Sequence, residues 1–152
     1  MTPGKIRVQV ALERVAWIRA MLDALRRLPS SDLTAFLEDE RTAAAAESYL
    51  RRAIEGLLDL GRHILAKGFG EGLVEYKEIA AGLADRGIVS PGHRAALVAI
   101  AGYRNRLTHF YDEVKVEELH EIVTTHLDEI EAILNEVLAW LRNHPDLIDR
   151  SL

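Results

Sequence analysis

The segment Glu47-Ser-Tyr-Leu-Arg-Arg-Ala-Ile-Glu-Gly-Leu-Leu-Asp-Leu-Gly-Arg-His-Ile-Leu-Ala-Lys67 has the pattern that decides the fold. Its apolar residues recur at intervals of three and four, which is the spacing of one helix face. We expect a helix from about Asp39 to Lys67. Its expected core face is Tyr49, Leu50, Ala53, Ile54, Leu57, Leu60, Gly61 and Ile64. Gly56 and Gly61 each cost roughly 1 kcal/mol of helix stability relative to alanine, so they indicate places where another helix can approach closely.

Proline, glycine and capping residues divide the rest of the chain into further helices. Leu28-Pro29 ends the first, because proline disfavours helix in the residue before it. Ser90-Pro91 is a start signal, with serine as the N-cap and proline at the first helical position. The other expected helices are Lys5–Leu28, Leu33–Glu38, Tyr76–Asp85, Ser90 to about His109, and Val116–Arg142. No segment alternates as a strand does. The sequence therefore predicts one all-α domain, residues 1–152, built as an antiparallel bundle of about five helices.

Composition bounds the class of protein. The chain has 152 residues, no cysteine and a formal net charge of -5. Disulfides and thiolate metal sites are excluded, and the longest apolar runs are too short to span a bilayer, so we expect a cytoplasmic protein. The acidic total argues against a general nucleic-acid coat protein, because phosphate binding needs concentrated positive charge. The helices are unusually long and leave apolar surface for a second copy, so we also expect a homodimer.

One short segment, Arg104-Asn-Arg-Leu-Thr-His109-Phe-Tyr111, concentrates polar chemistry at the end of an otherwise apolar helix. If that helix continues to His109, Asn105 lies four residues before it on the same face, where its amide could orient the imidazole. Arg104 and His109 are five residues apart, which is about 140° around an ideal helix axis. Their side chains can point toward the same site only if the helix ends near Thr108 or if two copies of the chain share one site.

Arginine, histidine and an amide are what metal-independent RNA cleavage requires. A neutral imidazole, with an ordinary pKa of ~6.5, can take the proton of a ribose 2′-hydroxyl. A guanidinium can hold the phosphate through two hydrogen bonds and stabilise the charge of a pentacoordinate transition state. The alternative is a solvated helix end, because cations near a helix C-terminus complement the helix dipole.

The pattern Arg104-x-x-x-x-His109-x-Tyr111, with Asn105 after the arginine, resembles the R-x(4–6)-H signature of HEPN domains. Its H-x-Y extension is most similar to that of the HepT-like toxins, and the segment from Ile54 to Ile64 looks like the second helix of that family. The resemblance implies a homodimeric ribonuclease toxin with a composite site across the dimer interface. It implies Arg104 and His109 as the catalytic pair and Asn105 as a polar helper. Because cleavage by an imidazole and a guanidinium requires no bound cation, we expect no cofactor.

The same resemblance implies a protein partner. HepT-like toxins are neutralised by a minimal nucleotidyltransferase (MNT-type) antitoxin, which transfers AMP to the motif tyrosine; by match, that residue is Tyr111. The adduct would place a bulky negative charge beside a cleft that must accept RNA phosphates, so inactivation by repulsion and blockage is physically reasonable. From the pattern alone, Tyr111 would simply pack against the start of the last helix.

Some features of the sequence support alternative interpretations. Four residues near the motif are candidates for binding RNA such as tRNA or mRNA: His93, Arg94, Arg106 and Thr108. The alternative for them is scattered surface charge. His120 and His126 are six residues apart, which is not the spacing that places two ligands on one helix face, so we expect no metal site. Two other functions stay open: a non-catalytic helical partner of a nucleotidyltransferase, and a purely structural dimeric bundle.

Overall fold

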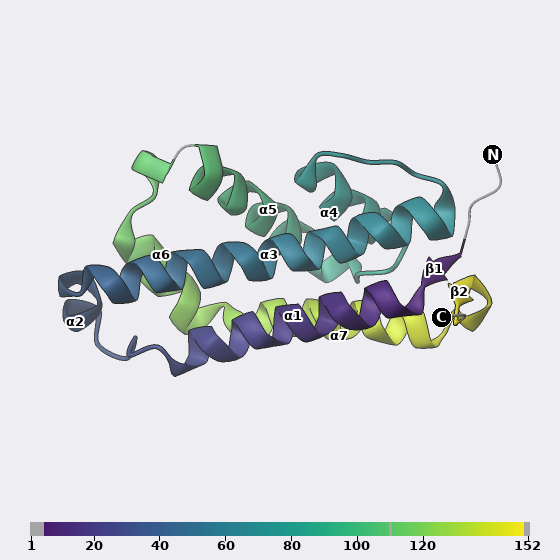
Figure 1. The fold of residues 1–152 in the computed structure, drawn as a ribbon. Helices are drawn as coiled ribbons and strands as arrows, with labels where there is room; N and C mark the ends of the chain where they lie inside the picture. Colours follow the sequence, from purple (N-terminus) through teal and green to yellow (C-terminus); the bar gives the residue numbers. More distant parts are fainter. Residues whose placement is uncertain (1–4, 110, 151–152) are drawn as a thin grey trace.

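The computed structural model describes residues 5–109 and 111–150, except for the side chain of Tyr111. Helices make up most of this part of the chain (Figure 1), as the expected all-α class requires. The helices are α1 (Val8–Arg27), α2 (Leu33–Glu38), α3 (Glu40–Phe69), α4 (Tyr76–Asp85), α5 (Arg94–His109), α6 (Val116–Thr125) and α7 (Leu127–Arg142). Three single 3₁₀ turns accompany them: η1 (Pro91–His93), η2 (Tyr111–Glu113) and η3 (Pro145–Leu147).

Helix α3 is the central element of the bundle. It lies beside α1 along most of its length and also contacts α2, α4, α5 and α6 (Figure 1). The Asp39 carboxylate caps its start by accepting a hydrogen bond from the Arg41 N–H at 3.0 Å. Gly70 ends it in the left-handed conformation, with φ of 69°, which glycine adopts without steric cost. The predicted helix from Asp39 to Lys67 is therefore confirmed to within two residues.

The expected core face of α3 is buried except for Tyr49, which is only partly buried, and burial also extends further round the helix. Leu58 and Leu65 lie outside the expected face and are also fully buried, because α3 has neighbours on several sides. The expected close approach occurs at Gly61, where an added Cβ would lie 2.7 Å from a Leu83 methyl and 3.2 Å from an Ile79 methyl. Helix α4 therefore crosses α3 at this glycine, which fixes the position of Tyr76 at the start of α4.

The prediction of one continuous helix from Val116 to Arg142 is wrong. The chain leaves regular helix geometry at His126 (φ -113°, ψ 0°), which separates α6 from α7. The hydroxyls of Thr124 and Thr125 donate hydrogen bonds to main-chain carbonyls one turn earlier, at 2.7 Å and 2.5 Å. Such hydroxyl bonds compete with the helix ladder and bend helices, so this threonine pair accounts for the break.

One smaller expectation about local structure also fails. The Ser90 hydroxyl does not cap the following helix: Pro91–His93 forms a 3₁₀ turn, and α5 begins only at Arg94. The chain also contains strand pairing, since β1 (Ile6–Arg7) pairs in parallel with β2 (Ile148–Asp149) and brings the two ends of the described chain together (Figure 1). Within the described residues, no helix has both the length and the apolar character of a membrane span.

Candidate active site at the end of helix α5

Three of the predicted site residues meet at one open cavity of about 330 Å³. They are Arg104, Asn105 and His109, all in the last two turns of α5. The opposite wall comes from α3, from the start of α4 and from the segment between them. The residues contributed there are Arg62, Val74, Glu75 and Tyr76. The cavity therefore forms where α5 ends against the α3–α4 pair.

Arg104 points inward from α5, and its side chain is only 19% exposed. Its Nε donates to the Glu55 carboxylate at 3.3 Å, and its Nη1 donates to the Asn105 amide oxygen at 3.3 Å. Its guanidinium carbon lies 4.6 Å from the centre of the Tyr76 ring, within the range of a cation–π interaction. A carboxylate, an amide and an aromatic face thus fix the orientation of this cation.

Glu55 is a site-supporting residue that the sequence did not indicate. It lies on α3, and its Oε1 accepts hydrogen bonds from both Arg51 at 2.9 Å and Arg104 at 3.3 Å. The spacing of Arg51 and Glu55, four apart on one helix, already suggests that these two form a pair. Nothing in the local sequence reveals that Arg104, forty-nine residues away, shares the same carboxylate.

Tyr76 and Arg62 form the second polar group of the cavity. The Tyr76 hydroxyl donates to Asp59 at 2.8 Å, and Arg62 donates to the same carboxylate oxygen at 2.9 Å. Burial, aided by the hydrogen bond to Asp59, raises the pKa of Tyr76 to about 12. This phenol is therefore protonated at neutral pH and serves as a fixed ring surface, since both Arg62 and Arg104 lie over it.

His109 is the exposed residue of the predicted pair. Among the described residues it has no hydrogen-bond or ion-pair partner, and the Asn105 amide oxygen accepts from Arg104. The Asn105 amide oxygen thus accepts a hydrogen bond from Arg104, whereas the sequence predicts that the Asn105 amide orients the His109 imidazole. The structure describes α5 as helical through His109, one residue past Thr108. Arg104 and His109 nevertheless line the same cavity within one chain.

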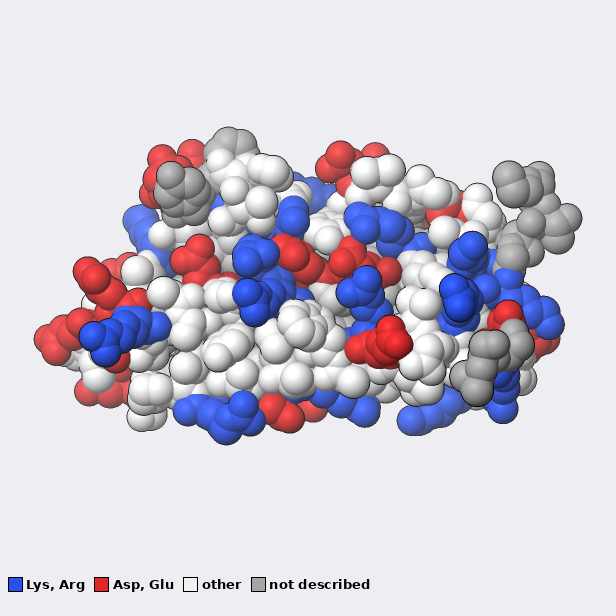
Figure 2. All heavy atoms as spheres, in the orientation of Figure 1, with Lys and Arg blue, Asp and Glu red and all other residues white. Residues whose placement is uncertain are grey.

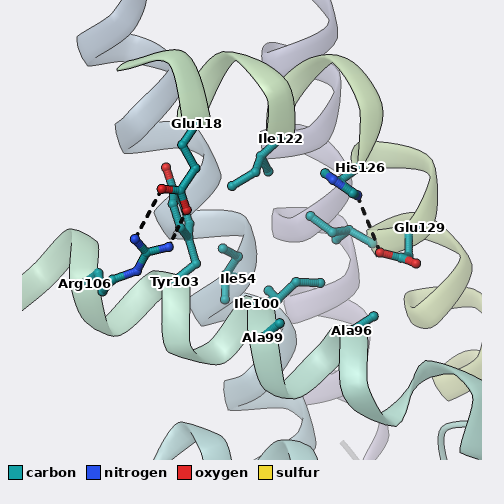
Figure 3. Close-up of a pocket in the computed structure, with 11 residues that line it drawn as sticks. Ile54, Ala96, Ala99, Ile100, Tyr103, Arg106, Glu118, Ile122, His126 and Glu129 are labelled. Atoms are coloured by element: carbon teal, nitrogen blue, oxygen red, sulfur yellow. Dashed lines mark hydrogen bonds and ion pairs between the residues drawn. The ribbon is translucent and has the colours of Figure 1, made fainter. Parts of the chain in front are cut away.

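The four candidate RNA-binding residues do not line this cavity. Arg106 turns to the opposite side of α5, where it pairs with both carboxylate oxygens of Glu118 above the buried Tyr103 (Figure 3). There it borders a second hollow, of about 300 Å³, between α5 and the α6–α7 segment. Arg94 and His93 lie at the other end of α5, paired with Asp85 at 3.5 Å and Glu136 at 2.8 Å. Thr108 is exposed.

Two further predictions concern a modification site and metals. The side chain of Tyr111, the expected site of AMP transfer, lies outside the described part of the structure. His120 bonds to the Ser30 carbonyl at 2.7 Å, and His126 lies 3.7 Å from Glu129. Over residues 5–109 and 111–150, no three His, Asp or Glu side chains gather as metal ligands would.

Charge is mixed over the surface. On the face drawn in Figure 2, basic and acidic side chains are interspersed, and acidic ones gather at the end that carries α2. No broad basic face is seen in this view that would attract nucleic acid by itself. A local source of positive charge is the pair Arg62 and Arg104, which line one cavity together with one carboxylate, Glu75.

A helical bundle that carries Arg104, Asn105 and His109 at one polar cavity is an all-α domain of the HEPN type. The chain belongs to the HepT-like ribonuclease family: residues 18–137 match the family described as Ribonuclease HepT-like. No curated protein matches the sequence.

Solved structures with the same fold include two toxin complexes. One is a toxin–antitoxin complex with AMP-PNP, at TM-score 0.78 and 18% identity over 86% of this chain and 98% of that one. Another is the tri-AMPylated HEPN toxin of Shewanella oneidensis with its MNT antitoxin, at TM-score 0.77 and 18% identity over 86% and 97%. The cytosolic protein YutE of Bacillus subtilis, of unknown function, is similar at TM-score 0.73 and 18% identity over 88% and 90%. At this identity the likeness establishes the fold.

Proposed function

We propose that the protein is a metal-independent endoribonuclease, the toxin of a toxin–antitoxin pair. The observation that carries this proposal is that Arg104, Asn105 and His109 line one open cavity in a chain of the HepT-like ribonuclease family. A cavity of about 330 Å³ that is open to solvent has room for one nucleotide linkage. Its polar groups are a guanidinium, an amide and an imidazole, which together suit phosphodiester cleavage.

The proposed reaction is attack by the ribose 2′-oxygen on the adjacent phosphorus. His109 accepts the 2′-hydroxyl proton, which its exposure and lack of a described partner leave it free to do. Arg104 holds the phosphate oxygens and stabilises the added negative charge of the pentacoordinate transition state. The bond from phosphorus to the 5′-oxygen breaks, and that oxygen takes a proton from water. The products are a 2′,3′-cyclic phosphate and a free 5′-hydroxyl.

The proposed active form is a homodimer in which two copies build a composite cleft. Support comes from the cavity itself, which is open to solvent and is lined by the exposed His109. A second copy that covers this opening would complete the cleft. Sedimentation equilibrium of the purified chain tests the dimer, and a monomer at all concentrations would contradict it.

The proposed antitoxin is a nucleotidyltransferase that transfers AMP to Tyr111. Two similar solved structures are toxin–antitoxin complexes, and one of those toxins is AMPylated. Tyr76 also borders the cavity, but its hydroxyl is bound to Asp59 and its pKa is raised to about 12, so it is a poor nucleophile. Mass spectrometry after co-expression should find one AMP on the peptide that contains Tyr111. An adduct only on another residue would contradict this assignment.

RNA cleavage in the presence of EDTA tests the ribonuclease itself. The unmodified protein should cleave RNA and arrest growth when expressed, and Arg104→Ala and His109→Ala should abolish both effects. Arg26→Ala is the matched control, because Arg26 pairs with Asp128 and Glu131 away from the cavity. Cleavage that survives both site substitutions would contradict the assignment. A stable antitoxin complex without any cleavage would instead identify a non-catalytic binding partner.

A further inference from the structure

The cavity contains a second arginine, Arg62, which no motif in the sequence marks. It comes from α3, whereas Arg104 comes from α5, and both guanidinium groups lie over the Tyr76 ring, at 5.1 Å and 4.6 Å from its centre. One aromatic side chain therefore holds two cations at one cavity. A single phosphate needs only one bidentate guanidinium, so the second cation is available for another group of the substrate.

The Arg62 guanidinium is fixed in place, but not all of its N–H donors are used. Its Nη1 donates to Asp59 at 2.9 Å, and its Nη2 donates to the Val74 carbonyl at 3.0 Å. A guanidinium has five N–H donors, so these two bonds leave three for a ligand. The side chain is 40% exposed, compared with 19% for Arg104, so it meets solvent at the edge of the cavity.

The carboxylate that Arg62 contacts is shared with a second donor. The same Asp59 oxygen also accepts the Tyr76 hydroxyl, so one carboxylate oxygen serves two donors. Of the residues that line the cavity, Arg62 and Arg104 are cationic and only Glu75 is acidic. An anion that enters the cavity therefore contacts two guanidinium groups and one carboxylate, because Asp59 and Glu55, the acids paired with the two arginines, do not line the cavity.

We propose that Arg62 binds a second phosphate of the RNA, next to the one held by Arg104, and so positions the strand for cleavage. This inference rests on the proposed ribonuclease function. Arg62 acts as a substrate-binding residue and takes no part in bond making or breaking. It would give the site a preference for RNA that continues on both sides of the scissile linkage over a dinucleotide with a single phosphate.

Fluorescence anisotropy with a short single-stranded RNA tests the inference apart from catalysis. The full chain carrying His109→Ala serves as background, so that the RNA is not cleaved. In this background, Arg62→Gln should weaken binding by about five- to tenfold and reduce the slope of log K against log salt by about 0.7, the contribution of one phosphate contact on a single strand. Arg26→Gln, which removes one positive charge elsewhere, should change neither quantity.

The variant Asp59→Asn separates binding from a structural role. It weakens the tie that holds Arg62 and Tyr76 but leaves the arginine charge, so RNA binding should stay equal or become tighter. If Arg62 only supported the conformation of the Val74 segment, Asp59→Asn and Arg62→Gln would weaken RNA binding alike, and that result would overturn the proposal. Unchanged RNA binding by Arg62→Gln would also overturn it. If neither the His109→Ala background nor the unmodified protein binds RNA, the ribonuclease proposal is overturned as well. This outcome differs from failure of the Arg62 proposal alone, in which RNA still binds but Arg62→Gln has no effect.

Discussion

Replacing Arg104 with lysine keeps the charge of the cavity but should remove most of the activity. The guanidinium reaches three partners at once: Glu55 and Asn105 at 3.3 Å each, and the Tyr76 ring at 4.6 Å. An ammonium group is one compact centre without the planar fork, so it cannot keep these contacts and also bind two phosphate oxygens side by side. The substitution therefore tests geometry at constant charge.

The expected magnitudes differ sharply for activity and for stability. Loss of one preorganised donor at a developing negative charge costs about 10²- to 10³-fold in rate, or ~2.7–4 kcal/mol, and we expect Arg104→Lys to fall in that range. The fold should change little, because Glu55 keeps its bond to Arg51 at 2.9 Å and no carboxylate is left alone. We expect a loss of at most about 1 kcal/mol, which is roughly 2–4 °C in Tm for a chain of this size.

Single-turnover cleavage of a labelled RNA in EDTA, with thermal unfolding followed by circular dichroism, measures both quantities. Arg51→Lys is the matched control, because it touches the same carboxylate from outside the cavity and should cleave at nearly the unmodified rate. An Arg104→Lys protein that cleaves as fast as the unmodified one would refute the reasoning, since charge alone would then suffice. A large fall in Tm would instead show that Arg104 mainly supports the fold.

Three further substitutions test the packing around the site. Tyr103→Phe should leave the free energy of unfolding in urea unchanged or raise it by about 1 kcal/mol, because the buried hydroxyl has no hydrogen-bond partner among the described residues; a clear loss would reveal one. Gly61→Ala should destabilise by about 1–2 kcal/mol in the same assay, because overpacking against the buried Leu83 exceeds the gain of ~1 kcal/mol in helix propensity; a gain in stability would show that Leu83 moves aside freely. Burial and nearby positive charges lower the pKa of His63, and its Nε2 accepts a hydrogen bond from the Arg7 N–H at 3.0 Å. Neutral His63 therefore stabilises the fold above its ordinary pKa of ~6.5. This stabilisation is lost as the pH falls below that value, because the unfolded chain then binds the proton more readily than the folded one. Urea unfolding from about pH 7 to about pH 5 should therefore show a smaller loss for His63→Gln than for the unmodified protein, and equal losses would contradict this account.

Local signals in the sequence were sufficient for most of the helices. The apolar periodicity from Asp39 to Lys67 located α3 to within two residues, and Tyr76–Asp85 is observed with the predicted bounds. The break at His126 was missed because the apolar stripe continues through it. Its signal was the preceding threonine pair, whose hydroxyls bond back to the helix carbonyls. Periodicity reports which face is buried and says little about whether the helix axis stays straight.

The site was predictable only where it lies on one helix. Arg104, Asn105 and His109 are close in sequence and lie at one helix end, although their angular spacing alone did not place Arg104 and His109 at a common point. Arg62 and Tyr76 reach the same cavity through the packing of α3 and α4, and no local pattern encodes which side chains will meet across such a contact. Thus the motif helix could be read from the sequence, whereas the wall opposite it required the fold.

Arg104 and Arg106 show why neighbouring cations in one motif differ in what they can do. They are about 200° apart around α5, so they face opposite sides of the helix. Arg106 offers both Nη groups to the two oxygens of Glu118, and this bidentate pair leaves it little capacity to bind anything else. Arg104 reaches a carboxylate that is already bonded to Arg51, and its Nη2 has no partner among the described residues. Because an unpaired buried charge is costly, Glu55 and the Tyr76 ring stabilise this cation. Neither of them saturates its donors, so a phosphate can bind without first breaking a strong ion pair.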